Sequence, residues 1–264
     1  MASNISLTVS DGIAHVTLAR PELRNAFNAA VIEELYDVFM RLAAADDVCA
    51  VVLGGEGKVF CGGADINWMR ASLDLTFEAN LADAERMSDM YRAIDNSPKP
   101  VIGRIHGAAL GGGAGLVAVC DVAVAADDTV FGFTEVKLGI LPATISPFVL
   151  AKIGASAARA LFVTGERFDA VRAKAIGLVH EVVPSGALDA AIERTLSEIR
   201  SAGPNAIAAA KLVVRRVLDN SYDASRAITT EAIARQRVSP EGQEGLRAFL
   251  DHRPAKFTKP TVSS

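Results

Sequence analysis

A glycine-rich stretch in the middle of the chain is the feature that most constrains its fold. The residues HGAALGGGAG (106–115) include five glycines and three alanines, and none carries a hydroxyl or a full charge. Because glycine has no Cβ, such a stretch can adopt backbone conformations closed to other residues and lets other segments approach closely. The stretch therefore offers backbone N–H and C=O groups rather than side-chain chemistry, which must come from elsewhere in the sequence.

The segments around this stretch predict alternating strands and helices. Residues 5–9 and 13–18 flank Asp11-Gly12, a dipeptide that favours a tight hairpin between two strands. Apolar periodicity predicts the remaining elements. The further strands are expected at 49–55, at 101–105, at 122–125 and at the start of 131–135. The helices are expected at 29–45, at 76–95 and from the glycine stretch to about residue 119. Repeated strand–helix units predict an α/β core.

The last part of the chain is predicted to be mainly helical. The expected helices cover 146–153, 155–163, 170–175, 185–200, 204–218, 222–237 and 241–251. Ser201-Ala202-Gly203-Pro204 is the best candidate for a linker, because glycine and proline interrupt helices. We therefore predict a core at 1–200 and a C-terminal helical region at 201–264.

Composition excludes several classes of function. Half of the 264 residues are hydrophobic and the net charge is −4, so the surface as a whole does not attract nucleic acid or anionic membrane. Cys49, Cys61 and Cys120 form no CxxC pair, which indicates free thiols, and the scattered histidines suggest no metal site. The N-terminus shows no signal-peptide pattern, and the uncharged runs 107–120 and 138–151 are short for a bilayer. We expect a cytoplasmic protein.

Three interpretations of the glycine stretch remain open. A phosphate-binding loop fits poorly, because Leu116 stands where GxGxxG needs glycine and no Lys-Ser or Lys-Thr follows. A purely structural role is the second, since glycines let a helix pack closely on a sheet. The third is an oxyanion site, in which free N–H groups at a helix start hydrogen-bond a carbonyl oxygen. FCGGADI (60–66) is another glycine-rich turn that could supply a second N–H.

The sequence resembles the enoyl-CoA hydratase/isomerase (crotonase) superfamily over nearly its whole length. The resemblance rests on motifs that occur in the family's order. They are RPELRNAFN (20–28), GKVFCGGADI (57–66), SPKPVIGRIHGAALGGGAG (97–115), CDVAVAADDTVFGFTEVKLGILP (120–142), LFVTGERFDA (161–170), AKAIGLVHEVVP (173–184) and EGLRAFLDHRPAKF (244–257).

The resemblance implies a fold and a mode of catalysis. The expected fold is α/β, a crotonase-like spiral of ββα units with a C-terminal helical trimerisation region, in a homotrimer or a dimer of trimers. Members bind an acyl-CoA thioester and stabilise its enolate with two backbone N–H groups. By motif position these donors are Ala64 and Gly112, with Gly111 beside the substrate. Coenzyme A is part of the substrate, so no separate cofactor is expected.

The resemblance also exposes one departure from the family pattern. Hydratases of the family use two glutamates, and the first of these positions is Gly115 here, whereas the second is Glu135. A Δ3-Δ2-enoyl-CoA isomerase needs only one base, so Gly115 favours that reaction on chemical grounds. A catalytically silent acyl-CoA binder is a further alternative. Glu135 could be an ordinary surface glutamate, but its apolar neighbours in FGFTEVKLGILP favour a shifted pKa and a catalytic role.

Other segments favour a hydratase. Residues 63–69, 133–154 and 164–184 look like the bacterial subgroup that contains methylglutaconyl-CoA hydratases, in which glycine is frequent at the position of Gly115. The substrates of that subgroup bear a second carboxylate. We therefore expect an enoyl-CoA hydratase for a branched or carboxylated 2-enoyl-CoA.

The remaining candidate residues are expected to bind substrate. Arg24 lies in a loop through which the family binds CoA, and the backbone at Ala64, Asp65 and Ile66 is expected near the adenine. Asp65 could instead simply cap the next helix. The other candidates each have a structural alternative as core or solvated residues. They are Trp68 and Met69 for the acyl pocket, and Phe249 and Lys256 for the CoA of a neighbouring subunit.

Overall fold

The computed structural model describes residues 3–258, which divide into two compact units. One unit consists of residues 3–97 and 101–192, and the other of residues 98–100 and 193–258. The linker predicted at 201–204 includes the last residue of α7 (Leu188–Ser201) and the first residue of the next helix. It lies after the division between the units, which follows Ile192. The ends of the predicted ranges 1–200 and 201–264 fall outside the described residues.

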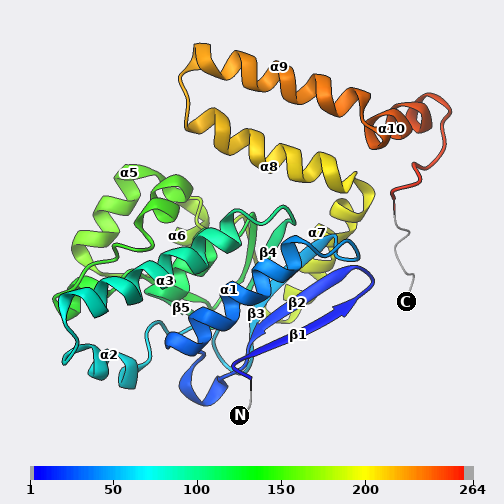
Figure 1. Cartoon of the computed structure of the whole chain (residues 1–264). Coiled ribbons are helices and arrows are strands. Elements are labelled where there is room, and N and C mark those ends of the chain that lie inside the picture. The colour runs from blue at the N-terminus through cyan, green and yellow to red at the C-terminus, as the bar shows by residue number, and fades with distance from the viewer. Residues whose placement is uncertain (1–2, 259–264) are drawn as a thin grey trace. The chain divides into compact units, whose positions relative to one another are not determined.

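A six-stranded sheet organises the first unit (Figure 1). In order across the sheet its strands are β1 (Ile5–Ser10), β2 (Ile13–Leu18), β3 (Ala50–Gly55), β4 (Val101–Ile105), β6 (Val122–Ala126) and β9 (Glu181–Val183). The first two form the predicted antiparallel hairpin, and every later neighbour pairs in parallel. Because β3 and β4 are parallel neighbours, the loops that follow them leave the same edge of the sheet.

A second, three-stranded sheet contains part of the glycine stretch. Its strands are β5 (Ala108–Leu110), β7 (Val130–Gly132) and β8 (Arg167–Asp169). Neither β5, β8 nor β9 is among the predicted strands, because a three-residue strand is too short to show an alternating pattern. The half of the glycine stretch before Gly111 is thus mainly strand, and the half after it is helix α4 (Gly112–Ala118).

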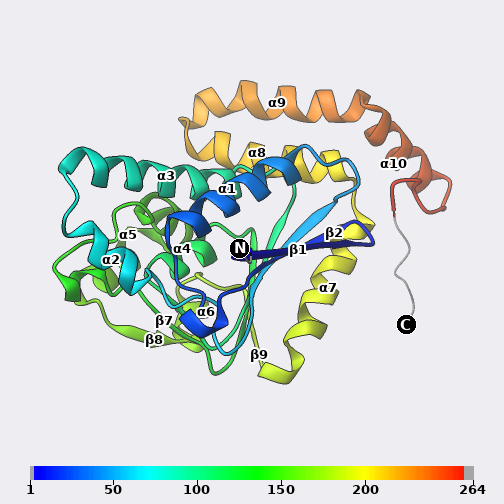
Figure 2. The ribbon, with the colours of Figure 1, turned by 60° about the horizontal axis from the view of Figure 1, so that its bottom comes forward.

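Two long helices lie side by side over one face of the large sheet (Figures 1 and 2). They are α1 (Ala29–Ala43), which ends two residues before the predicted end, and α3 (Phe77–Asp95). The apolar face of α1, which includes Val31, Leu35, Val38 and Leu42, is buried in the core. The side chains of Asn28 and Thr76 accept hydrogen bonds from backbone N–H groups of the first turns, as N-caps do.

The other helices of this unit are α2 (Ile66–Ser72), α5 (Ser146–Thr164) and α6 (Ala170–Ala175), with 3-10 turns at η1 (Pro21–Leu23), η2 (Glu135–Leu138) and η3 (Ser185–Ala187). Helix α5 is interrupted at Gly154, where φ is 74° and ψ is 163°, which confirms the predicted break after residue 153. Within residues 3–258 only α5 is long and apolar enough to cross a membrane. Four of its residues, Val149, Ile153, Ala158 and Leu161, are buried, whereas most of the helix is not.

The second unit contains the predicted C-terminal helices. They are α8 (Pro204–Leu218), α9 (Tyr222–Val238) and α10 (Pro240–Leu250). The carboxylate of Glu241 accepts hydrogen bonds from the N–H groups of Asn205 and Ala206, at 3.0 and 2.8 Å, so α10 supplies the cap of α8. Ser221 and Ser239 cap the two later helices in the same way.

Close backbone contact joins the loops that leave β3 and β4. Phe60 N–H donates to the carbonyl of His106 at 2.9 Å. At the adjoining Gly107, φ is +64° and an added Cβ would overlap the carbonyl oxygen of Lys58. Only glycine meets both requirements, so this position holds the two loops together at the base of the candidate site.

We expect Gly107→Ala to lower the free energy of unfolding by about 2–4 kcal/mol, because it adds positive-φ strain and a backbone clash. Gly186→Ala is the matched control, since Gly186 has no positive φ and no atom within 4 Å of its added Cβ. This change should stay within about 0.5 kcal/mol of the parent protein. Urea unfolding measures both variants, and equal midpoints would contradict the expected clash.

Candidate active site

A backbone bridge aligns the two glycine-rich turns. Cys61 N–H donates to the carbonyl of Ala108, and Leu110 N–H donates to the carbonyl of Cys61, both at 3.0 Å. Cys61 thereby pairs in parallel with Ala109. Ala64 lies three residues after Cys61, and Gly112 lies three residues after Ala109. The bridge therefore puts the two predicted donors at the same register position of the two turns.

The N–H of Ala64 is oriented by the loop at 20–28. Phe27 N–H donates to the carbonyl of Gly63 at 2.8 Å, and that carbonyl belongs to the same planar peptide as the Ala64 N–H. The Ala64 N–H therefore points away from Phe27. Among the described residues it has no hydrogen-bond acceptor, and it is free to bind a ligand oxygen.

The N–H of Gly112 opens helix α4. Gly111 before it has φ 51°, and its own N–H is taken by the carbonyl of Gly132 at 2.8 Å. Gly112 N–H finds no acceptor in the described part of the chain, as expected in the first turn of a helix. The phenol of Tyr91 donates a hydrogen bond to the carbonyl of Gly112 at 2.7 Å, which helps to hold this turn in place. The apolar helix predicted after the glycines is confirmed.

Glu135 supplies the carboxylate of the site. It begins η2, which is separated from the end of β7 by two residues, and a Cβ added at Gly111 would lie 3.2 Å from its Oε1. Its Oε2 is buried and has no hydrogen-bond partner in the described structure. Burial raises the pKa of Glu135 above its ordinary value, and a backbone hydrogen bond offsets part of that shift. The group is therefore no ordinary surface glutamate.

Apolar side chains fill the space beside Gly115. An added Cβ would overlap Cγ2 of Ile145 and would come within 3.1 Å of the Tyr91 ring. Tyr91 is fully buried and contacts the ring of Phe148, with 5.7 Å between ring centroids. A second carboxylate is thus not merely missing at this position, because the packing has closed the space that it would need.

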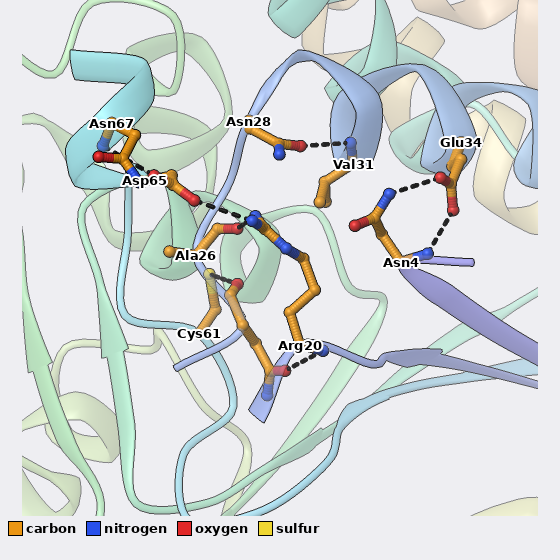
Figure 3. A network of polar contacts seen from close by, with 10 residues as sticks. Asn4, Arg20, Ala26, Asn28, Val31, Glu34, Cys61, Asp65 and Asn67 are labelled. Atoms are coloured by element: carbon orange, nitrogen blue, oxygen red, sulfur yellow. Dashed lines mark hydrogen bonds and ion pairs between the residues drawn. The ribbon is translucent and has the colours of Figure 1, made fainter. Parts of the chain in front are cut away.

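The loop at 20–28 is held by a network that the motifs did not reveal (Figure 3). The Arg20 guanidinium binds the carboxylate of Asp65 at 2.9 Å, and the same carboxylate caps α2 by accepting from Asn67 N–H. Buried Asn25 donates to the carbonyls of Glu56 and Val59 at 2.8 Å. Arg24, the residue that the sequence singled out, is exposed.

The structure does not bring every predicted contact residue into the core of this site. The Ile66 side chain is exposed, whereas Trp68 and Met69 on α2 are half-buried. Trp68 packs against the core, which agrees with its structural alternative. Phe249 and Lys256 belong to the second unit, and both are exposed. Their predicted contact with the CoA of a neighbouring subunit stays a prediction.

Comparison with known proteins gives a consistent result. Residues 8–260 match the family model for enoyl-CoA hydratase/isomerase. The chain is similar to the crystal structure of an enoyl-CoA hydratase from Shewanella pealeana, with 37% identity, a TM-score of 0.93 and coverage of 96% of this chain and 95% of that one. The crystal structure of an enoyl-CoA hydratase from Mycobacterium smegmatis is 34% identical, with a TM-score of 0.92 and coverage of 97% of this chain and 99% of that one. An enoyl-CoA hydratase of Alternaria alternata is 34% identical over 80% of this chain and 70% of its own. The expected fold class is confirmed.

We expect the Glu135 carboxyl to titrate above its ordinary value of 4.5. The folded protein then binds this proton more tightly than the unfolded chain, so ionisation destabilises the fold as pH rises through that pKa. Any step that uses the carboxylate as a base should slow as pH falls through the same pKa. Infrared spectra recorded over a range of pH follow the band of the protonated carboxyl and give the pKa of Glu135. The same spectra of the Glu135→Gln variant assign the band, since it should be missing there. A midpoint at or below 4.5 would contradict the burial argument.

We expect Gly115→Glu to destabilise the fold by about 3 kcal/mol or more, because it forces side-chain overlap and buries a charge. In an Ile145→Ala background the same change should cost less, since the overlapping Cγ2 is gone. A double-mutant cycle of unfolding free energies measures this coupling. Equal costs in both backgrounds would show that Ile145 does not occupy the space.

Proposed function

Because the chain belongs to the enoyl-CoA hydratase/isomerase family, we propose that it adds water to a 2-enoyl-CoA thioester, with Ala64 and Gly112 as oxyanion donors and Glu135 as the acid–base group. One observation carries this proposal. Among the described residues, a buried carboxylate oxygen of Glu135 has no hydrogen-bond partner and its carboxyl lies beside Gly111, and the Cys61–Ala109 bridge aligns two turns whose N–H groups at Ala64 and Gly112 are likewise unpaired there.

The two N–H groups stabilise the charge that develops on the thioester oxygen. When a nucleophile adds at C3, the carbonyl becomes an enolate and its oxygen gains negative charge. Preorganised donors lower the barrier of such a step, and one of them is worth roughly 3–4 kcal/mol where it was removed from an enzyme. The positive end of α4 at Gly112 acts in the same direction, although the helix is short.

One carboxylate can perform both proton transfers. Glu135 takes a proton from water, and the oxygen of that water forms a bond with C3, while the C2–C3 π electrons form the C1–C2 double bond of the enolate and the carbonyl π electrons move to the thioester oxygen. Glu135 then returns its proton to C2, and the thioester carbonyl forms again. Water is added with no net change in the carboxyl. The raised pKa of Glu135 favours this double role, because it brings the proton affinity closer to that needed at neutral pH.

The proposed substrate is a branched or carboxylated 2-enoyl-CoA such as methylglutaconyl-CoA. The likeness of residues 63–69, 133–154 and 164–184 to hydratases for such substrates supports it. The closed space beside Gly115 supports it as well. With no second protein carboxylate there, a carboxylate of the substrate is available to orient the water. Arg24 and the backbone at 64–66 are the proposed contacts of CoA, and the proposed setting is a cytoplasmic trimer or dimer of trimers.

Isomerisation of a 3-enoyl-CoA is the second candidate function. The observation that favours it is the same closed space, since a single base suffices to move a proton between C4 and C2. Both reactions pass through an enolate that the same two N–H groups would stabilise. They differ in whether an oxygen from water enters the product.

We expect 18O from labelled water to appear at C3 of the 3-hydroxyacyl product when the protein acts on 2-enoyl thioesters. Crotonyl-CoA and methylglutaconyl-CoA are the substrates to compare by mass spectrometry. Glu135→Gln should lower kcat by about 100- to 10,000-fold, the usual contribution of an acid–base group. Turnover of 3-enoyl-CoA without label in any product would favour the isomerase. Unchanged turnover in Glu135→Gln would exclude Glu135 as the base.

A further inference from the structure

Arg20 is a nearly buried cation that contacts two different segments of the site. Its side chain is 12% exposed. Its Nη1 donates to the carbonyl of Ala26 at 2.7 Å, and its Nη2 binds Oδ2 of Asp65 at 2.9 Å. Figure 3 shows the end of the Arg20 side chain next to both partners. One planar group therefore holds the loop at 20–28 and the turn at 60–66 at the same time.

The two partners of Arg20 are sequence neighbours of Phe27 and Ala64, the residues whose pairing orients one of the oxyanion donors. Ala26 precedes Phe27, and Asp65 follows Ala64. Phe27 and Ala64 form an isolated parallel bridge, in which Phe27 N–H donates to Gly63 at 2.8 Å and Phe27 accepts from Asp65 N–H at 2.7 Å. Arg20 thus binds the residue next to each member of the bridge that orients the Ala64 N–H.

We infer that Arg20 is a positioning residue for the Ala64 N–H, and this inference rests on the proposed function. The guanidinium binds Ala26 and Asp65 and so holds together the two segments that the Phe27–Ala64 bridge joins. It thereby sets the direction in which the peptide of Gly63 and Ala64 points its N–H at the thioester oxygen. Arg20 does not touch the substrate, and it acts through Phe27 and Asp65.

The chemistry of the contacts requires arginine. A guanidinium presents several donors in a fixed plane, so it can bind a carbonyl and a carboxylate in different segments without bending. A lysine ammonium has the same charge but no such plane. Burial by itself raises the pKa of Asp65, but hydrogen bonds from Asn67 N–H and Arg20 outweigh it, and the pKa falls below its ordinary value. The carboxylate is therefore ionised at neutral pH.

Arg24 offers a natural contrast four residues away. It is exposed, and its stem lies over Gly62, where an added Cβ would be 3.1 Å from Arg24 Cβ. Arg24 is the proposed CoA contact, whereas the side chain of Arg20 is nearly buried. Loss of Arg24 should weaken binding, and loss of Arg20 should slow the reaction of the bound substrate.

The test compares Arg20→Gln and Arg20→Lys with Arg24→Gln and with Glu34→Ala. Glu34 accepts hydrogen bonds from Asn4 and Ile5 near the start of the chain, so its loss controls for lower stability. We expect Arg20→Gln to lower kcat by about 10- to 100-fold at nearly unchanged KM, since small displacements of an aligned group can cost this much. Arg20→Lys should recover part of the loss. Arg24→Gln should raise KM, and Glu34→Ala should keep kcat.

A spectroscopic measurement separates positioning from a general loss of structure. The C=O stretching frequency of a crotonyl thioester labelled with 13C at the carbonyl is measured when it is bound to Glu135→Gln protein, which should turn it over slowly. Hydrogen bonds from the two N–H groups should lower this frequency relative to the free thioester. The decrease should be smaller in Arg20→Gln/Glu135→Gln and unchanged in Glu34→Ala/Glu135→Gln.

Two negative results have different meanings. If Glu135→Gln protein itself does not lower the frequency, the oxyanion site of the proposed function is wrong. If it does, and the Arg20 double variant lowers the frequency equally at unchanged kcat for Arg20→Gln, the positioning role is wrong. Should Arg20→Gln not fold, Arg20→Lys decides. A full decrease with parental kcat overturns the inference, whereas a reduced decrease with reduced kcat supports it.

Discussion

The hydrogen bonds between Cys61 and the strand at Ala108–Leu110 are the contacts on which the site depends. They join two turns that leave parallel neighbouring strands, and the shared register then brings Ala64 and Gly112 to the same height. The close contacts at Gly63 and Gly113 exist because these two turns are packed together, with added Cβ atoms 3.1 and 2.7 Å from backbone oxygens. Glycine is needed in these turns for proximity first and for chemistry second.

The backbone, the buried carboxylate and the apolar side chains have different roles in this site. The backbone supplies the donors, and burial sets the proton affinity of the one carboxylate beside them. Tyr91 and Ile145 decide what else can enter, because they occupy the space next to Gly115. The glycine at this position and the isoleucine at 145 are one packing solution, so neither residue can be interpreted without the other. The proposed single-base chemistry follows from that pair.

The sequence predicts the parts of the site whose role shows in a local pattern or in the family resemblance. The glycines at 106–115 indicate exposed backbone, the strand and helix periodicities place them between β4 and α4, and the family resemblance selects Ala64, Gly112 and Glu135. Arg20 and Ile145 escape because their roles arise from contacts across the fold. Arg20 and Asp65 are 45 residues apart, and an apolar residue at 145 has no local sign of what it displaces. The short strands β5, β8 and β9 escape because three residues carry no period.

The use of main-chain donors has a consequence for substitutions at these positions. The N–H of Ala64 or Gly112 is present whatever side chain the position carries, and only proline removes it. A substitution at Ala64 by a residue other than proline leaves that N–H in place, whereas a side chain at Gly112 would overlap Phe27 and Tyr91 and displace the turn. The proposed oxyanion contacts therefore depend on the packing that holds the two turns in place.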